Sequence, residues 1–321
     1  MVNDNYLKNK IDEVGNLYEY DLLKDFLQND YREDDYLYSF YSSCIQNIER
    51  TNLPNCVYKL LWEWTNQNKK KCPDLMNSFD TYMNEIVYDM TNNDAMMKKE
   101  LEKYKKIIGN KIQKPSSQLV LYFMRNYEMR EVMHRKMKLI MEKMIELSKW
   151  TDTIGNFILL PQTKRGKRGE NVYKNGTAKD RMDVYLYNLE KFFVDQSDGI
   201  NAPKAFVEYI NSNYLWDYVN KKYEVIPLFQ TNNKFEEILP NDPEEYITFA
   251  DNIIKNIQYR GMFMEIMIRL SIESQEIFEE VKETRNANNY AEVIAEIEKI
   301  REIKKINLSK KLKDLIMSFR C

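Results

Sequence analysis

The chain of 321 residues has little glycine, proline and histidine, with counts of 8, 8 and 1. Because glycine and proline are the main breakers of secondary structure, their scarcity predicts long uninterrupted segments. Cysteine is also sparse, and Cys44, Cys56, Cys72 and Cys321 form no CxxC pair. The wide spacing of the cysteines and the presence of a single histidine, His134, argue against a zinc site and a disulfide framework. They indicate free thiols in a reducing cytosol. We therefore expect no metal and no cofactor.

Long hydrophobic runs are missing as well. Residues 1–15 have neither a basic start nor an apolar stretch, unlike a signal peptide, and no segment approaches the ~20 apolar residues of a membrane helix. Lys and Arg number 48 against 50 Asp and Glu, so the net charge of -2 draws the chain to neither nucleic acid nor membrane. With 43% hydrophobic residues, the sequence predicts a soluble cytoplasmic protein with a sizeable core and no membrane partner.

Apolar residues recur at three- and four-residue spacing through most of the chain, which predicts amphipathic helices. We expect helices over residues 15–29, 54–67, 75–90, 95–108, 119–150, 180–193, 206–219, 244–270 and 274–319. No segment alternates as a half-buried strand would, and no repeat of fixed period is present. The predicted fold class is all-α, a multi-helix protein with one irregular glycine-containing insertion.

Three regions follow from this pattern: an N-terminal helical region 1–114, a central helical domain 115–272 and charged C-terminal helices 273–321, which can also form one continuous domain. The C-terminal region, divided near 286–289, carries an aliphatic stripe that suits a helical hairpin or a dimer seam, and we favour the hairpin. Trp62 lies off the apolar stripe of its helix. This position is typical either of a partner-binding anchor or of a residue on a helix that packs on two sides. Gly261 inside helix 244–270 would let another backbone come close.

The stretch from Thr151 to Phe193 contains four of the eight glycines. Its apolar run 154–160 ends at Pro161 and is too short for a helix, so we expect a buried extended segment or turn. In the polar loop that follows, four cations surround Gly166: Lys164, Arg165, Lys167 and Arg168. Such a loop can surround a phosphate and contact nucleic acid or an acidic partner, or it is an ordinary solvated loop. Its glycines match neither GxxxxGK[ST] nor GxGxxG.

A helix start follows the basic loop. Asp180 can serve as N-cap with Asp183 at the capping-box position three residues later. Arg181 can pair with either carboxylate or with a phosphate at the loop. We favour the structural role for these residues over a role in a site.

The series TIGNFILLP, a basic loop and KDRMDVYLYNLEKFF resembles an uncharacterised bacterial domain family. The matching positions are Thr153, Gly155, Asn156, Phe157, Pro161, Arg168, Gly169, Asp180, Arg181 and Asp183, with looser similarity to about Leu270. This resemblance implies a domain identity and no chemistry. The stretch is also similar to the HNH-type nuclease domain of Gmr-type modification-dependent restriction enzymes. The chain lacks the HIxP-like motif that supplies that domain's catalytic His, so no active HNH site is implied.

Arg130 and His134 lie one helical turn apart on the expected helix 119–150. The pair resembles HEPN-type ribonucleases, all-helical enzymes whose Arg and His act on RNA at a dimer interface, although only three residues intervene here. The resemblance implies proton exchange by the imidazole and phosphate stabilisation by Arg, with Asp180 and Asp183 as further candidates. The competing interpretation is a histidine at the surface or one whose hydrogen bonds are satisfied within the fold, and we favour it.

The expected function is that of an interaction or accessory protein, from a bacterial mobile element or defence locus, that uses the basic loop. The C-terminal helices are the expected site for a protein partner or a second copy. The alternative is the helical ribonuclease, and the sequence leaves open whether the chain is an enzyme.

Overall fold

The computed structural model describes residues 2–22, 51–65, 67, 71–77, 142–143, 146–147, 149–161, 182–196, 202–228, 243–283, 287 and 289–319. Most of these residues are helical, which confirms the predicted class. The helices are α1 (Val2–Val14), α4 (Asn52–Trp62), α9 (Met182–Gln196), α10 (Ala202–Ser212), α11 (Pro243–Glu273), α12 (Gln275–Glu283), α13 (Tyr290–Lys304) and α14 (Lys310–Ser318). Single 3-10 turns occur at Leu17–Glu19, Ile154–Asn156 and Trp216–Tyr218.

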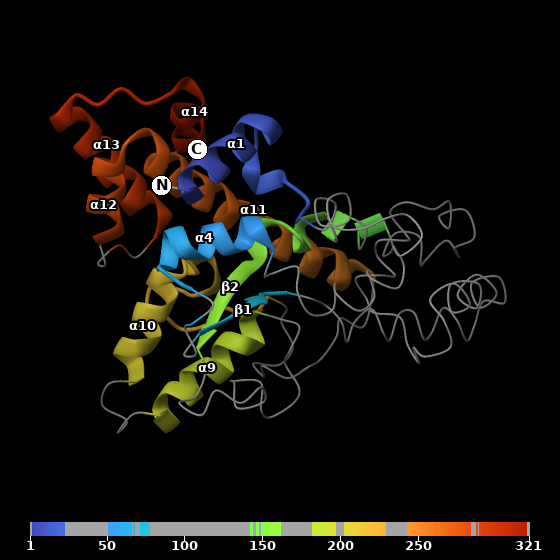
Figure 1. Cartoon of the computed structure of the whole chain (residues 1–321). Helices are drawn as coiled ribbons and strands as arrows, with labels where there is room; N and C mark the ends of the chain where they lie inside the picture. Colours follow the sequence, from blue (N-terminus) through green and yellow to red (C-terminus); the bar gives the residue numbers. More distant parts are fainter. Residues whose placement is uncertain are drawn as a thin grey trace.

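Helix α11 is the central element of the described structure. Its 31 residues confirm the helix predicted over 244–270. From Phe263 to Leu270 its residues are buried on every side, because other elements surround it rather than cover one face. In Figure 1, α1 and α12–α14 lie on one side of α11, whereas α4, the strands, α9 and α10 lie on the other. The elements therefore share one hydrophobic core.

Two short strands correct the expectation that no segment forms a strand. Strand β1 (Lys71–Leu75) pairs antiparallel with β2 (Phe157–Pro161), in a register that places Lys71 opposite Pro161 and Leu75 opposite Phe157. Residues 157–160 are all buried, so β2 shows a continuous apolar run without alternation. The prediction of a buried extended segment is confirmed there. The helix predicted over 75–90 is wrong for residues 75–77, and its residues 78–90 lie outside the described residues.

The N-terminal helix begins and ends earlier than the sequence predicts. Helix α1 covers residues 2–14, and Gly15 ends it in the left-handed conformation with φ of 77°. The helix predicted over 15–29 is therefore wrong for residues 15–21, while 23–29 lie outside the described residues. The missed signal was the pair Leu7 and Ile11, which stand four positions apart and are both buried.

The C-terminal region forms three helices where two were predicted. The break near 286–289 is confirmed, and a second break follows Lys305, which ends α13 in the left-handed conformation. Helix α12 packs against α13 and also against α11, and α14 contacts α11. The aliphatic stripe is buried within the chain at Ile294, Ile297, Ile300, Leu308, Leu312 and Leu315. Intramolecular packing therefore covers these residues, as the hairpin interpretation expected, whereas Ile303 of the same stripe is exposed.

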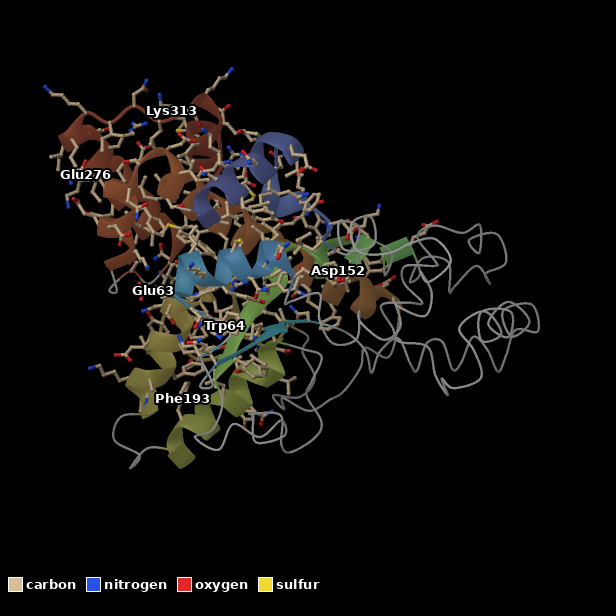
Figure 2. The ribbon with its side chains drawn as sticks, in the orientation of Figure 1. Glu63, Trp64, Asp152, Phe193, Glu276 and Lys313 are labelled. Atoms are coloured by element: carbon tan, nitrogen blue, oxygen red, sulfur yellow. The ribbon has the colours of Figure 1, made fainter. Side chains whose placement is uncertain are left out.

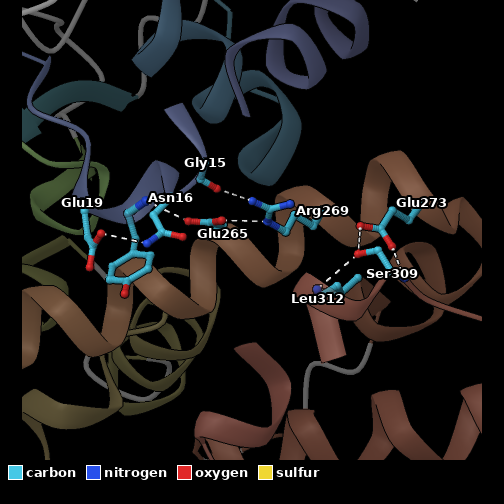
Figure 3. A network of polar contacts seen from close by, with 9 residues as sticks. Gly15, Asn16, Glu19, Glu265, Arg269, Glu273, Ser309 and Leu312 are labelled. Carbon is cyan, nitrogen blue, oxygen red and sulfur yellow. Dashed lines mark hydrogen bonds and ion pairs between the residues drawn. The ribbon is translucent and has the colours of Figure 1, made fainter. Parts of the chain in front are cut away.

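Polar contacts join both ends of the chain to α11 (Figure 3). Those of Glu265 and Arg269 are buried or half-buried, and those of Glu273 are exposed. The carboxylate of Glu265 accepts hydrogen bonds from the Tyr18 amide at 2.9 Å and from Arg269 Nε at 2.7 Å. Arg269 Nη2 then donates to the carbonyl oxygen of Gly15 at 2.6 Å. Further along α11, Glu273 accepts from the amide and hydroxyl of Ser309, each at 2.8 Å, just before α14 begins.

Candidate functional site

The turn at Ile154–Asn156 lies directly against the backbone of α11. A Cβ atom built on Gly155 would come within 2.1 Å of the Ile257 carbonyl oxygen and 2.9 Å of the Gly261 amide nitrogen. The expectation that Gly261 lets another backbone come close is thus confirmed, and the approaching backbone is that of Gly155. Glycine is needed here because of space and not because of a left-handed φ.

A buried asparagine pair joins this turn to the end of β1 and the start of α9. Asn156 Nδ2 donates to the carbonyl oxygens of Asn77 and Thr151 at 3.0 and 2.8 Å, and Asn156 Oδ1 accepts from the Asn77 amide at 3.1 Å. The Asn77 side-chain oxygen accepts from the Met182 amide at 3.0 Å. The Met182 amide lies in the first turn of α9, where amides have no partner within the helix. Asn77 therefore supplies its hydrogen-bond acceptor, although the two residues are far apart in sequence.

Arg260 of α11 is a fully buried cation whose bonds go to carbonyl oxygens. Nη1 donates to Gly155 and Phe157 at 2.7 Å each, and Nε donates to Asn213 at 2.9 Å. Among the described residues no carboxylate lies within ion-pair distance, and Nη2 has no hydrogen-bond partner. Burial lowers the pKa of this guanidinium. Its carbon lies 5.8 Å from the centroid of the Trp62 ring, a cation–π distance.

A cavity of about 560 Å³ opens between α4, β1 and β2, α9 and α10, α11 and the C-terminal helices. This size is within the range of roughly 300–1,000 Å³ that small-molecule sites occupy. Six aromatic side chains line it: Trp62, Phe193, Tyr209, Tyr214, Trp216 and Phe263. Figure 2 shows two of the lining residues, Glu63 where α4 ends and Phe193 on α9. We call this cavity the aromatic pocket.

Trp62 and the aromatic residues beside it hold one another in place. The Tyr214 ring packs 5.0 Å from Phe263 and 5.8 Å from Trp216, and Trp62 lies 6.3 Å from Tyr214, between ring centroids. Trp62 Nε1 also donates to the Ser212 carbonyl oxygen at 2.6 Å. The off-stripe tryptophan thus packs within the chain while one part of it lines the aromatic pocket.

Charged residues of both signs line the aromatic pocket. Lys282 forms an ion pair with Glu63 at 2.8 Å, and this pair lowers the pKa of the Glu63 carboxyl through hydrogen bonding and attraction. Glu208 lies 3.9 Å from Lys204 in an exposed pair. Lys71 has part of its surface exposed, yet the surrounding protein desolvates its ammonium and lowers its pKa. Among the described residues no carboxylate pairs with Lys71.

Two residues of the aromatic pocket occupy the left-handed backbone region that favours glycine. Glu63 follows α4 with φ of 53°, and Tyr214 follows α10 with φ of 56°. A non-glycine residue there is strained by about 1 kcal/mol. The chain therefore ends two helices with strained residues whose side chains line the aromatic pocket.

The structure describes one of the candidate site residues, Asp183. Its carboxylate is fully buried and accepts from the Leu228 amide at 3.0 Å, which joins α9 to the segment after the 3-10 turn Trp216–Tyr218. The remaining candidates, Arg130, His134, Lys164, Arg165, Lys167, Arg168, Asp180 and Arg181, lie outside the described residues. Their expected roles stay predictions.

Sequence reasoning did not single out Tyr214, Asn211 or Arg260. Arg260 carried a usable signal, since it is the only charged residue between Lys255 and Glu265 in a helix that the pattern predicts to be largely buried. Tyr214 and Asn211 carried none, because their importance depends on segments far apart in sequence.

Within the part of the chain that the structure describes, no three side chains are grouped as metal ligands. The same part has no helix that is long and apolar enough to cross a bilayer.

These features define a mostly helical protein with an aromatic pocket and a buried TIGNF turn. The chain belongs to a family of unknown function, DUF6994, whose model matches residues 65–264, more than half of the sequence. The matched range includes the turn, both strands and much of α11. It therefore also includes the TIGNFILLP segment on which the family resemblance was based. No curated protein and no solved structure matches the chain.

Proposed function

We propose that the chain is a noncatalytic binding protein whose basic loop, residues 162–181, contacts nucleic acid. The loop contains seven Lys or Arg against two Asp or Glu, within a chain whose net charge is -2. A locally concentrated positive charge attracts phosphates even when the whole protein is slightly acidic.

The observation that supports this proposal most is how the two ends of the loop are held. Pro161, just before it, is paired with Lys71 at one end of β1. Met182, just after it, is bonded through its amide to Asn77, which lies two residues beyond the other end of β1. The two residues that flank the basic segment in sequence, Pro161 and Met182, are thus both bound beside one short strand, and Pro161 and Lys71 also line the aromatic pocket.

The test replaces Lys164, Arg165, Lys167 and Arg168 with Ser and measures the affinity for a fluorescent single-stranded RNA at several salt concentrations. Counterion release predicts that each lost phosphate contact reduces the slope of log affinity against log salt by about 0.7. We expect a weaker complex whose slope falls by up to about 3 for four contacts. The difference from the unmodified protein should therefore shrink as salt rises.

A matched control removes the same charge elsewhere, with Lys305, Lys310, Lys311 and Lys313 replaced by Ser. Equal loss in both variants would mean that only net charge matters, and no loss in either would refute the loop proposal. If polyglutamate displaces the fluorescent RNA more strongly than unlabelled RNA does, the partner of the loop is an acidic protein and not nucleic acid. RNA cleavage that disappears in His134→Ala would favour the ribonuclease alternative instead.

A further inference from the structure

The aromatic pocket has three polar groups that no described residue satisfies: the Lys71 ammonium, the Asn211 side-chain nitrogen and the Tyr214 hydroxyl. Polar groups at the wall of a largely apolar site favour ligands that complete their hydrogen bonds. These three groups therefore indicate which chemistry the pocket can accept.

Asn211 presents its nitrogen in a fixed orientation. Its oxygen accepts from Trp216 Nε1 at 2.9 Å and from the Tyr223 hydroxyl at 3.0 Å. An indole nitrogen can only donate, so the amide atom facing Trp216 must be oxygen and the other must be the NH₂ group. That NH₂ group is a positioned donor for an acceptor atom of a ligand.

The two lysines of the aromatic pocket differ in charge balance. Glu63 neutralises Lys282 at 2.8 Å, whereas Lys71 has no carboxylate partner among the described residues. A partly desolvated ammonium without a counter-ion gains more from a bound anion than a solvated or paired one does. The anionic part of a ligand is therefore best placed at Lys71.

The aromatic residues provide the surface for a planar group. The rings of Trp62 and Tyr214 contact each other and are held by Ser212 and Phe263, so the wall is formed before a ligand arrives. Preorganised aromatic surfaces bind planar rings by stacking without a large ordering cost.

We propose that the aromatic pocket binds a small anion with a planar aromatic ring, placing the ring on Trp62 and Tyr214, the anionic group at Lys71 and an acceptor atom at Asn211. This inference goes beyond the proposed function, because it requires no residue of the basic loop. Nucleotides and aromatic carboxylates share this chemistry.

Isothermal titration calorimetry with two matched pairs tests the inference and separates the two sources. The pairs are adenosine monophosphate with adenosine, and 4-hydroxyphenylacetate with its amide. We expect at least one anion to bind about tenfold or more tightly than its neutral counterpart, which corresponds to about 1.4 kcal/mol. Preference for the nucleotide identifies a nucleotide site, and preference for the carboxylate identifies an aromatic-acid site.

The variant Lys71→Gln should remove the preference for the anion, whereas the matched variant Lys282→Gln should keep it. Asn211→Asp retains the acceptor for Trp216 but replaces the donor with a negative charge, so it should weaken anion binding. Urea unfolding of each variant shows that the fold is kept. The inference is overturned if neither anion binds at millimolar concentration, if neutral and anionic partners bind equally, or if Lys71→Gln binds like the unmodified protein. The variant with four Ser in the basic loop should bind normally, so the two proposals fail separately.

Discussion

Substitution of Gly155 by Ala should destabilise the protein more than the small size of the change suggests. The added Cβ would lie 2.1 Å from the carbonyl oxygen of Ile257, and neither atom can rotate away, since the backbone fixes the position of both. Relief requires a shift of about 1 Å between the turn and α11, whose core neighbours are closely packed. Overpacking of this kind costs about 3 kcal/mol or more, against a gain of about 0.4–1 kcal/mol from reduced chain entropy. The steric cost therefore exceeds the entropic gain, and the free energy of unfolding should fall.

Gly261→Ala is the matched control, since it adds the same methyl group from the other side of the contact. The nearest atoms would be Tyr18 Cβ at 3.3 Å and Gly155 Cα at 3.4 Å, which a small adjustment accommodates. Alanine also favours the helix by about 1 kcal/mol, so this variant should stay within about 1 kcal/mol of the original. Urea unfolding followed by circular dichroism measures both, and with a slope of about 3 kcal/mol per molar the Gly155→Ala midpoint should fall by about 1 M. Equal midpoints for the two variants would refute the reasoning.

Two further predictions concern buried carboxylates. Burial raises the pKa of Asp217 from 3.8 to about 6, so the folded state binds the proton more tightly and stability should fall by up to about 3 kcal/mol as pH rises from about 4 to about 6. Asp217→Asn should remove this fall in urea titrations from pH 4 to 7, and an unchanged pH profile would contradict the assignment. Glu265→Ala should cost about 3–5 kcal/mol in urea unfolding because Arg269, its partner at 2.7 Å, loses its buried counter-charge. A cost under about 1 kcal/mol would show that Arg269 needs only the Gly15 carbonyl oxygen.

The candidate site was predictable only in parts that depend on local pattern. The run 154–160 was expected to be buried, and Trp62 stood out because it left its helix stripe. The pairing of β1 with β2 was missed because residues 71–75 contain Pro73 and show no alternation. Proline is tolerated in this strand because, among the described residues, only β2 pairs with β1, and it pairs along one edge of the strand.

Periodicity determined the mostly helical class and the extent of α11, because a helix repeats its buried face every three to four residues. The asparagine-rich segment 286–289 predicted the division between α12 and α13. The same local reasoning identified Gly261 as a point of close backbone approach. Only the tertiary structure decided what approaches it, which amide Asn77 satisfies and where Arg260 finds its carbonyl oxygens. These contacts join residues up to 106 positions apart, as Gly155 and Gly261 are, and the aromatic pocket draws on segments from Leu61 to Val293. Spacing along a chain contains no information about such distances, since packing in three dimensions sets them.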